Sequence, residues 1–336
     1  MVNKCRSTYF DIPLTTWGTV VDQTVSGLVK LAARENAPNP RYLSAITDIG
    51  ELLLFDKDGS KLYGPVGPFT GHGSPDELSI NVDALVLIRS GTNLALINAD
   101  GTVRWNFQGA SAIANLRAAK IGQNYVCALL TVHNDAASSG VQWRSLTDGS
   151  IVQAVYGTAQ PPDVTQYGPY APNIAVSQTG DRAAIGYSKY LFGTIGPTYL
   201  EHHHRTSGRL WSTMFISGGS LSLARWKIAV DKDGGYTIAA VRDGVEGVAF
   251  PYSYCAVYDS TGLLIGEPFK LGGSANTYFG VCMAPDGKQA GAYWDSGASY
   301  YLGRTIIVPY THATTALAAK GKGIDITDDD LYYMVG

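Results

Sequence analysis

Three consecutive histidines, His202, His203 and His204, form the most conspicuous cluster of chemically capable side chains in this sequence. Side chains alternate along a β-strand, so His202 and His204 would share one face about 7 Å apart, while His203 points the other way. Two imidazoles on one face can bind a transition metal, with Glu201 or a residue from elsewhere as a further ligand. The alternative is a solvated outer strand that binds nothing, and the sequence leaves both interpretations open.

Aromatic side chains in two loop-like stretches form the second candidate site. Residues 158–172, TAQPPDVTQYGPYAP, contain four prolines, which exclude regular strand pairing there. The aromatic residues of the two stretches are Tyr167, Tyr170, Phe250, Tyr252 and Tyr254. Loops held on a rigid scaffold often carry recognition, so we expect these side chains to contact a protein partner or a surface glycan.

No arrangement of residues typical of catalysis is visible. The sequence lacks a G-x-S-x-G elbow, a phosphate-binding G-x-x-x-x-G-K-[ST] loop and an H-E-x-x-H metal motif. The sequence therefore predicts a protein that is not an enzyme and uses no cofactor. The histidine triplet keeps a metal-dependent enzyme as the alternative.

The elements that position these residues follow a repeating pattern. Residues 84–109, ALVLIRSGTNLALINADGTVRWNFQG, predict three short strands separated by two tight turns. Asp100 and Gly101 form the second turn, because Asp-Gly supplies the positive φ that a hairpin needs. Trp105 lies four residues beyond that glycine. One such unit cannot bury both of its own faces, so copies are expected elsewhere.

Copies cover most of the chain. The equivalent turn glycines are Gly59, Gly101, Gly149, Gly208 and Gly262. They recur at intervals of about 40 to 60 residues, the period of four-stranded propeller blades with loop insertions. A fourth strand precedes the other three in the stretches 173–181, 227–235 and 279–287. The repeat therefore predicts four strands per unit.

This order of strands and turns, with Gly91, Asp100, Gly101 and Trp105 in its best copy, resembles the quinoprotein-type propeller blade. It is similar, more loosely, to WD-repeat blades. The resemblance covers roughly residues 27–310 and implies architecture, because such propellers include cofactor-bearing dehydrogenases, assembly scaffolds and plain binding proteins. The chain departs from the dehydrogenases in having no vicinal cysteine pair, so the resemblance implies no cofactor.

The predicted fold is a single all-β propeller of four-stranded blades, six in number, with seven as the alternative. Residues 27–310 form the propeller, and 27–33 is expected to be a strand rather than part of a helix. Residues 1–26 form an N-terminal segment with a strand that pairs with the last blade and closes the ring, since a propeller must hide its open edges. Residues 311–336 form a closing segment with an acidic and apolar tail, in which 311–322 could be strand or short helix.

Composition narrows the partners. The 336 residues carry a net charge of −3 without a basic tract, which argues against nucleic acid. No stretch approaches 18 apolar residues, so no membrane-spanning segment is expected. The N-terminus lacks the apolar run of a secretory signal peptide.

These observations together favour a non-enzymatic structural or recognition module on a larger assembly, such as a virion or cell-surface component, which binds through its inter-blade loops. A virion or extracellular surface is the expected location, and the cytoplasm is the alternative. Two other functions stay open. One is an enzyme that uses the central channel, and the other is a carbohydrate-binding propeller.

Overall fold

The structure, a computed structural model, describes residues 28–33, 42–47, 51–56, 60–67, 77–107, 114–132, 140–156, 173–191, 194–216, 225–242, 253–271, 279–295, 300–317, 321–326 and 331–335. Within these ranges all regular structure is β-strand and no helix occurs, so the all-β prediction is confirmed. The same ranges accordingly hold no helix that could cross a membrane.

Six sheets have four strands each, and we number them in chain order. Sheet 1 consists of β1 (Leu28–Ala33), β2 (Leu43–Thr47), β3 (Leu52–Phe55) and β4 (Lys61–Val66). Sheet 2 consists of β5 (Glu77–Ile80), β6 (Val86–Ser90), β7 (Asn93–Ile97) and β8 (Val103–Phe107). Sheet 3 consists of β9 (Ala114–Ile121), β10 (Tyr125–Val132), β11 (Gly140–Ser145) and β12 (Ile151–Tyr156).

Sheet 4 consists of β13 (Asn173–Val176), β14 (Arg182–Leu191), β15 (Thr194–His204) and β16 (Gly208–Ile216). Sheet 5 consists of β17 (Arg225–Val230), β18 (Thr237–Arg242), β19 (Ser253–Tyr258) and β20 (Leu264–Leu271). Sheet 6 consists of β21 (Phe279–Met283), β22 (Gln289–Asp295), β23 (Tyr300–Ile306) and β24 (Thr311–Leu317). A further two-stranded sheet pairs β25 (Gly321–Ile326) with β26 (Leu331–Val335).

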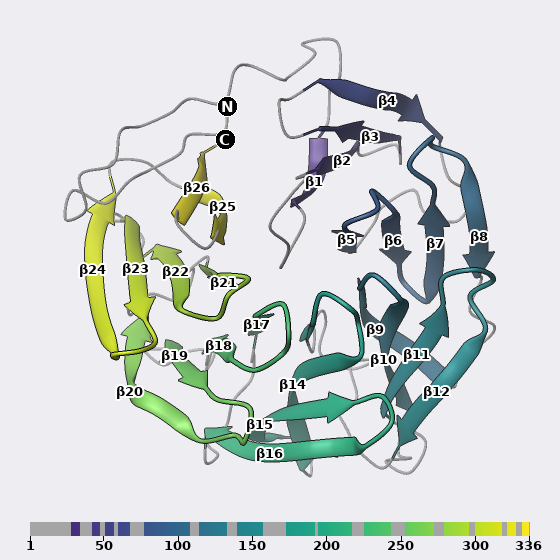
Figure 1. The fold of residues 1–336 in the computed structure, drawn as a ribbon. Coiled ribbons are helices and arrows are strands. Elements are labelled where there is room, and N and C mark those ends of the chain that lie inside the picture. Colours follow the sequence, from purple (N-terminus) through teal and green to yellow (C-terminus); the bar gives the residue numbers. More distant parts are fainter. Residues whose placement is uncertain are drawn as a thin grey trace.

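The sheets stand around a common axis (Figure 1). In every four-stranded sheet the strands are antiparallel and follow chain order, with the first strand innermost. The first strands of successive sheets contact one another from β1 round to β21, and β25 contacts β21. The β25–β26 pair lies between sheet 6 and sheet 1 (Figure 1). This arrangement is that of a β-propeller.

The strand predictions for the repeat units are confirmed. The stretch 84–109 forms β6, β7 and β8, and the strands predicted to precede the other three are the innermost strands β13, β17 and β21. β1 is a strand rather than a helix. Thr311–Leu317 is also a strand and extends sheet 6 beyond residue 310. Residues 1–26, with the predicted closing strand, lie outside the described ranges.

A short polar side chain and a glycine build the turns between third and fourth strands. In sheet 2, Asp100 Oδ1 accepts hydrogen bonds from the backbone N–H and the hydroxyl of Thr102, at 2.9 and 2.6 Å. In sheet 3, Asp148 binds Ser150 in the same way, at 3.1 and 2.8 Å. Gly101 has φ 85°, where a side chain would be strained. The Asp-Gly spacing therefore predicted these hairpins for the correct physical reason.

Aromatic rings cover several of these turn glycines from the preceding sheet. A Cβ atom added to Gly149, for example, would lie 3.1 Å from the indole of Trp105. The pairs, with that distance, are Tyr63 on Gly101 (3.3 Å), Trp105 on Gly149 (3.1 Å) and Trp211 on Gly262 (2.9 Å). Between sheets 5 and 6 the direction is reversed, because Tyr310 packs on Gly266 of β20. Glycine is needed here so that a ring can approach the backbone closely.

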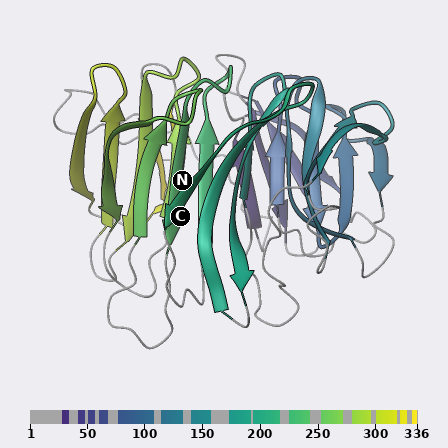
Figure 2. The same ribbon diagram turned by 90° about the horizontal axis from the view of Figure 1, so that it is seen from below.

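Backbone hydrogen bonds also join the innermost turns of successive sheets. They run from Gln123 N to Gln178 O (2.7 Å), from Gln178 N to Lys232 O (2.8 Å) and from Lys232 N to Pro285 O (3.0 Å). These turns and those between third and fourth strands gather at one face of the ring, the short-turn face (Figure 2). The sheets are thus fastened near the axis by backbone groups and near the rim by side chains.

Replacing Trp105 with alanine tests the contribution of the rings. Trp105 is buried, and its Nε1 donates a 3.0 Å hydrogen bond to the carbonyl of Leu146 in sheet 3. Trp105→Ala is expected to lower the free energy of unfolding by about 3–5 kcal/mol, measured by urea denaturation. Gln153→Ala, at the register-equivalent but exposed position of sheet 3, should stay within about 0.5 kcal/mol of wild type. Equal effects at the two positions would contradict this account.

Candidate functional site

Four of the five predicted loop aromatics, Tyr167, Tyr170, Phe250 and Tyr252, lie outside the described residues. They belong to the connections from β12 to β13 and from β18 to β19, and these strands end and begin at the face opposite the short-turn face. Tyr254 is described, and the prediction that it lies in a loop is wrong: it pairs with Val241 of β18 and is half-buried on β19, because the third strand of sheet 5 already begins at Ser253. The role predicted for these aromatics stays a prediction.

The histidine triplet is not on a solvated outer strand, and that alternative is wrong. β15 is the third strand of sheet 4, with β14 on one side and β16 on the other. His202 and His203 are both fully buried, with 0% of their surface exposed. The polar sequence suggested exposure, but neighbouring sheets cover both faces of this strand.

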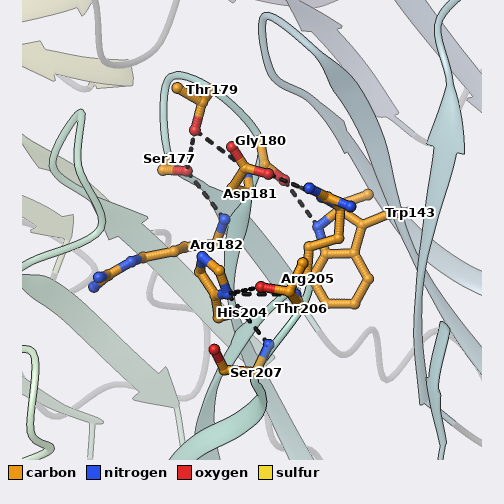
Figure 3. Close-up of polar contacts among 11 residues, drawn as sticks. Trp143, Ser177, Thr179, Gly180, Asp181, Arg182, His204, Arg205, Thr206 and Ser207 are labelled. Carbon is orange, nitrogen blue, oxygen red and sulfur yellow. Dashed lines mark hydrogen bonds and ion pairs between the residues drawn. The ribbon is translucent and has the colours of Figure 1, made fainter. Parts of the chain in front are cut away.

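His204 caps a turn (Figure 3). Its Nδ1 accepts hydrogen bonds from the backbone N–H groups of Thr206 and Ser207, each at 3.3 Å, and lies 3.1 Å from the Thr206 hydroxyl. Asp259 binds the following threonine in the equivalent turn of sheet 5, through both its backbone N–H and its hydroxyl. His204 therefore replaces the aspartate of the usual turn, which leaves its proton on Nε2.

The predicted metal site gains no further ligands from the structure. In the part of the chain that the structure describes, no group of three or more His, Cys, Asp or Glu side chains gathers at one point. The Nδ1 lone pair of His204 is already used by the turn. Metal binding by His202 and His204 stays a prediction.

His202 occupies the boundary between sheets 4 and 5. Its ring centroid lies 5.3 Å from that of Trp211, and neither ring nitrogen has a hydrogen-bond partner among the described residues. Burial, and then the charge of Arg182, lower the pKa of His202 to about 3, with smaller contributions from His203 and His204. His202 is consequently neutral at physiological pH and acts as part of the core.

A leucine in place of His202 is expected to reduce the sensitivity of the fold to acid. Because the unfolded histidine has a pKa of about 6.5 and the folded one about 3, the unfolded state takes up the proton first as the pH falls. This residue therefore costs the wild type roughly 1.4 kcal/mol per pH unit below about pH 6.5. Urea unfolding should show His202→Leu gaining about 2 kcal/mol over wild type between pH 7.5 and pH 5. A stability difference that does not change with pH would disprove the assignment.

A buried carboxylate on the other face of β15 collects four hydrogen bonds. Glu201 is 1% exposed and accepts from Tyr187 (2.8 Å), His203 (3.0 Å), Arg209 (3.1 Å) and Ser212 (3.3 Å). Burial acts to raise the pKa of Glu201, but the contributions of His203, Tyr187 and Arg209 together outweigh it and hold that pKa below its usual value. Burial and the Glu201 charge raise the pKa of Tyr187. The four donors satisfy the ionised Glu201 carboxylate, whereas the buried Nδ1 of His203 has no hydrogen-bond partner among the described residues.

Substitutions of Glu201 and of Arg209 are expected to change the free energy of unfolding by different amounts. Glu201→Gln removes a buried charge from its donors and is expected to lower the free energy of unfolding by about 3 kcal/mol or more. Arg209→Gln removes a partner whose side chain is 51% exposed, and should cost less than about 1 kcal/mol. Denaturation curves of the two variants measure the difference, and similar losses in both would refute it.

Sheets 3 and 4 are joined at the short-turn face by polar contacts (Figure 3). The carbonyl of Gly180 accepts hydrogen bonds from Trp143 Nε1 at 2.8 Å and from Cys127 Sγ at 3.1 Å. Asp181 forms a 3.0 Å ion pair with Arg205, whose guanidinium lies 4.7 Å from the ring centroid of Tyr125. The end of β15 and the turn before β14 therefore form one ordered polar surface.

A shallow depression of about 500 Å³ lies on the same face between sheets 2 and 3. Its lining residues are Asp83, Leu85, Asn98, Ala99, Asp100, Arg104 and Leu146. Hydrogen bonds from Thr102 hold the pKa of Asp100 below its usual value, so the carboxylate is ionised. Arg104 is held by a 2.7 Å hydrogen bond to Asn98. The depression offers charges of both signs beside an apolar wall.

Sequence reasoning missed the buried network and this depression. Glu201 and His203 are two residues apart on one strand, and that alternation was a usable signal for a shared face. The depression offered no such signal, because its residues come from three separate turns.

Comparison with known proteins identifies the architecture. No protein-family model and no curated protein matches the sequence. Among solved structures, the Neurospora crassa Pan2 WD40 domain aligns at TM-score 0.53 and 11% identity, over 92% of this chain and 90% of that one. The WD40 domain of Toxoplasma gondii coronin gives 0.54 and 10%, over 91% and 79%. The Dos1 propeller gives 0.52 and 11%, over 88% and 73%.

The chain thus has the β-propeller fold that WD40 domains share, and the predicted resemblance to WD-type propellers is confirmed at the level of architecture. At 10–11% identity these similarities establish the fold and leave function to be argued from the site.

Proposed function

We propose that the chain is a non-enzymatic structural or recognition module of a larger assembly, a virion or a cell-surface component. It binds a protein partner through the connections 157–172 and 243–252, which carry Tyr167, Tyr170, Phe250 and Tyr252. The observation that carries the proposal is that two connections with aromatic residues, one of them proline-rich, join strands of a β-propeller that end and begin at one face.

Two further observations support this function. The sequence is low in charge and rich in tyrosine and glycine, a composition suited to neutral contact surfaces rather than to a charged substrate. WD40 domains, which share this fold, often mediate protein interactions. The proposed location, a virion or an extracellular surface, follows from the proposed assembly.

The proposal is tested by sedimentation of particles from cells that produce the full chain. The protein is expected to co-sediment with particles, and Tyr167→Ser combined with Tyr170→Ser should reduce the particle-bound fraction at least severalfold without changing the unfolding midpoint. Tyr254→Ser on β19 serves as a matched tyrosine control outside those connections. A chain that is monomeric and absent from all particles would contradict the proposal.

The rival functions have their own readouts. A stoichiometric metal in elemental analysis, or a quinone band in the absorption spectrum of the native protein, would overturn the non-enzymatic assignment. Specific binding on a glycan array would replace the protein partner with a carbohydrate.

We further propose that β25 and β26 belong to a seventh blade that residues 1–26 complete, in place of the six-bladed ring favoured by the sequence. Among the described strands β26 pairs only with β25, and a two-stranded sheet leaves an open edge. Deleting residues 1–26 is then expected to lower the unfolding midpoint and to increase amide hydrogen exchange in β26. Unchanged exchange in β26 would rule out this closure.

A further inference from the structure

Four positions on the outer strands are equivalent by register. Each of these outer-strand residues pairs with a residue of the third strand. The next residue of the third strand then pairs with the outer-strand residue two positions earlier in the chain, which makes a β-bulge. The pairs are Leu54 with Tyr63, Leu96 with Trp105, Trp143 with Gln153, and His202 with Trp211. Three of the four outer-strand residues are aromatic, and sheet 3 alone among these four has glutamine.

The three aromatic residues all act in one way, since each ring packs on the turn glycine of the next sheet. Gly208, which follows Gln153 round the ring, has φ 76°, between the 74° of Gly149 and the 83° of Gly262. Yet no described atom outside its chain neighbours lies within 4 Å of a Cβ built on Gly208. The turn of sheet 4 therefore has a glycine with the φ of those that receive a ring in the other sheets, without the ring.

The missing ring has a structural explanation. In sheet 3 the large aromatic residue is Trp143, one strand further in, where it is fully buried and donates to the carbonyl of Gly180 (Figure 3). The inner part of the boundary between sheets 3 and 4 is therefore filled, while Gln153 at the rim is exposed. Trp105 and Trp211, at the equivalent places, are both buried.

Arg209 directly follows Gly208 in the chain and adds a charged group to this turn. Its guanidinium is tethered to Glu201 at 3.1 Å, and the side chain is still 51% exposed. A tethered guanidinium beside an aromatic ring favours binding through a cation–π contact, and indole is the best partner for it. The exposed side-chain amide of Gln153, on the outer strand of the preceding sheet, carries both a donor and an acceptor.

We propose that Gly208, Gln153 and Arg209 form a docking place for an aromatic side chain, preferably tryptophan, of a partner protein. The chain itself provides an example of such a contact, because an indole packs on the turn glycine at Gly149 and at Gly262. This place lies on the rim and does not depend on recognition by the loops.

The test uses N-acetyl-tryptophanamide as the probe and the full ¹⁵N-labelled chain in NMR titrations. Saturable shifts are expected at the Gly208 and Arg209 backbone amides and at the Gln153 side-chain amide. N-acetyl-leucinamide should bind roughly fivefold more weakly or worse, because it lacks the ring. Absence of these shifts, or shifts spread over other surfaces only, would overturn the proposal.

Two variants separate this site from adventitious binding. Gln153→Trp places an indole of the chain on Gly208 and is expected to raise the unfolding midpoint and to abolish the probe shifts. Should that variant not fold, Gly208→Ala puts a methyl group between turn and ring, and should weaken probe binding roughly fivefold. Met214→Ala, at an exposed position of β16 outside this place, is the matched control and should keep the probe shifts. Probe binding unaffected by Gly208→Ala would refute the site.

Discussion

The boundary between neighbouring sheets is the constraint on which this molecule depends. A four-stranded sheet has two apolar faces. One face is buried by the preceding sheet round the axis and the other by the following sheet. Towards the rim the sheets diverge, so that contact there needs a long side chain and a backbone that lets it approach. Tyr63, Trp105 and Trp211 supply the side chains, and turn glycines supply the backbone. Each glycine serves two purposes. It adopts the positive φ that closes the hairpin, and because it has no Cβ atom it leaves room for the ring.

The boundary between sheets 3 and 4 departs from this rule. Its aromatic residue has moved from the outer strand to Trp143, which packs in the apolar core between the two sheets, and the Glu201 network lies beside that core. A buried carboxylate with its donors is less tolerant of rearrangement than an apolar contact, since each lost partner leaves an unpaired charge. This boundary thus combines an apolar core, a buried polar network and an exposed rim.

The hairpin units and their preceding strands could be predicted from sequence because their signals are local. Asp100-Gly101 fixes a turn, and alternating apolar residues fix the strands on either side. Burial of His202 and His203 could not be predicted, because it depends on which strands flank β15 and on the partners that the rest of sheet 4 provides. The position of Gln153 was equally hidden, since a bulge sets its register and no residue type announces that bulge.

The innermost turns hold one another mainly through main-chain atoms. From Gln123 to Pro285 a chain of hydrogen bonds runs from peptide N–H groups to peptide carbonyls. Asn81 and Arg182 add side-chain hydrogen bonds to the carbonyls of Gly122 and Gly234. Any residue except proline at a donor position can supply such a main-chain hydrogen bond, so these positions place little demand on side-chain identity, unlike Gly122 and Gly180, which approach too closely for a Cβ. Substitutions can therefore accumulate at these positions of the innermost turns while the geometry is kept. In this way chains of very low sequence identity can share one architecture.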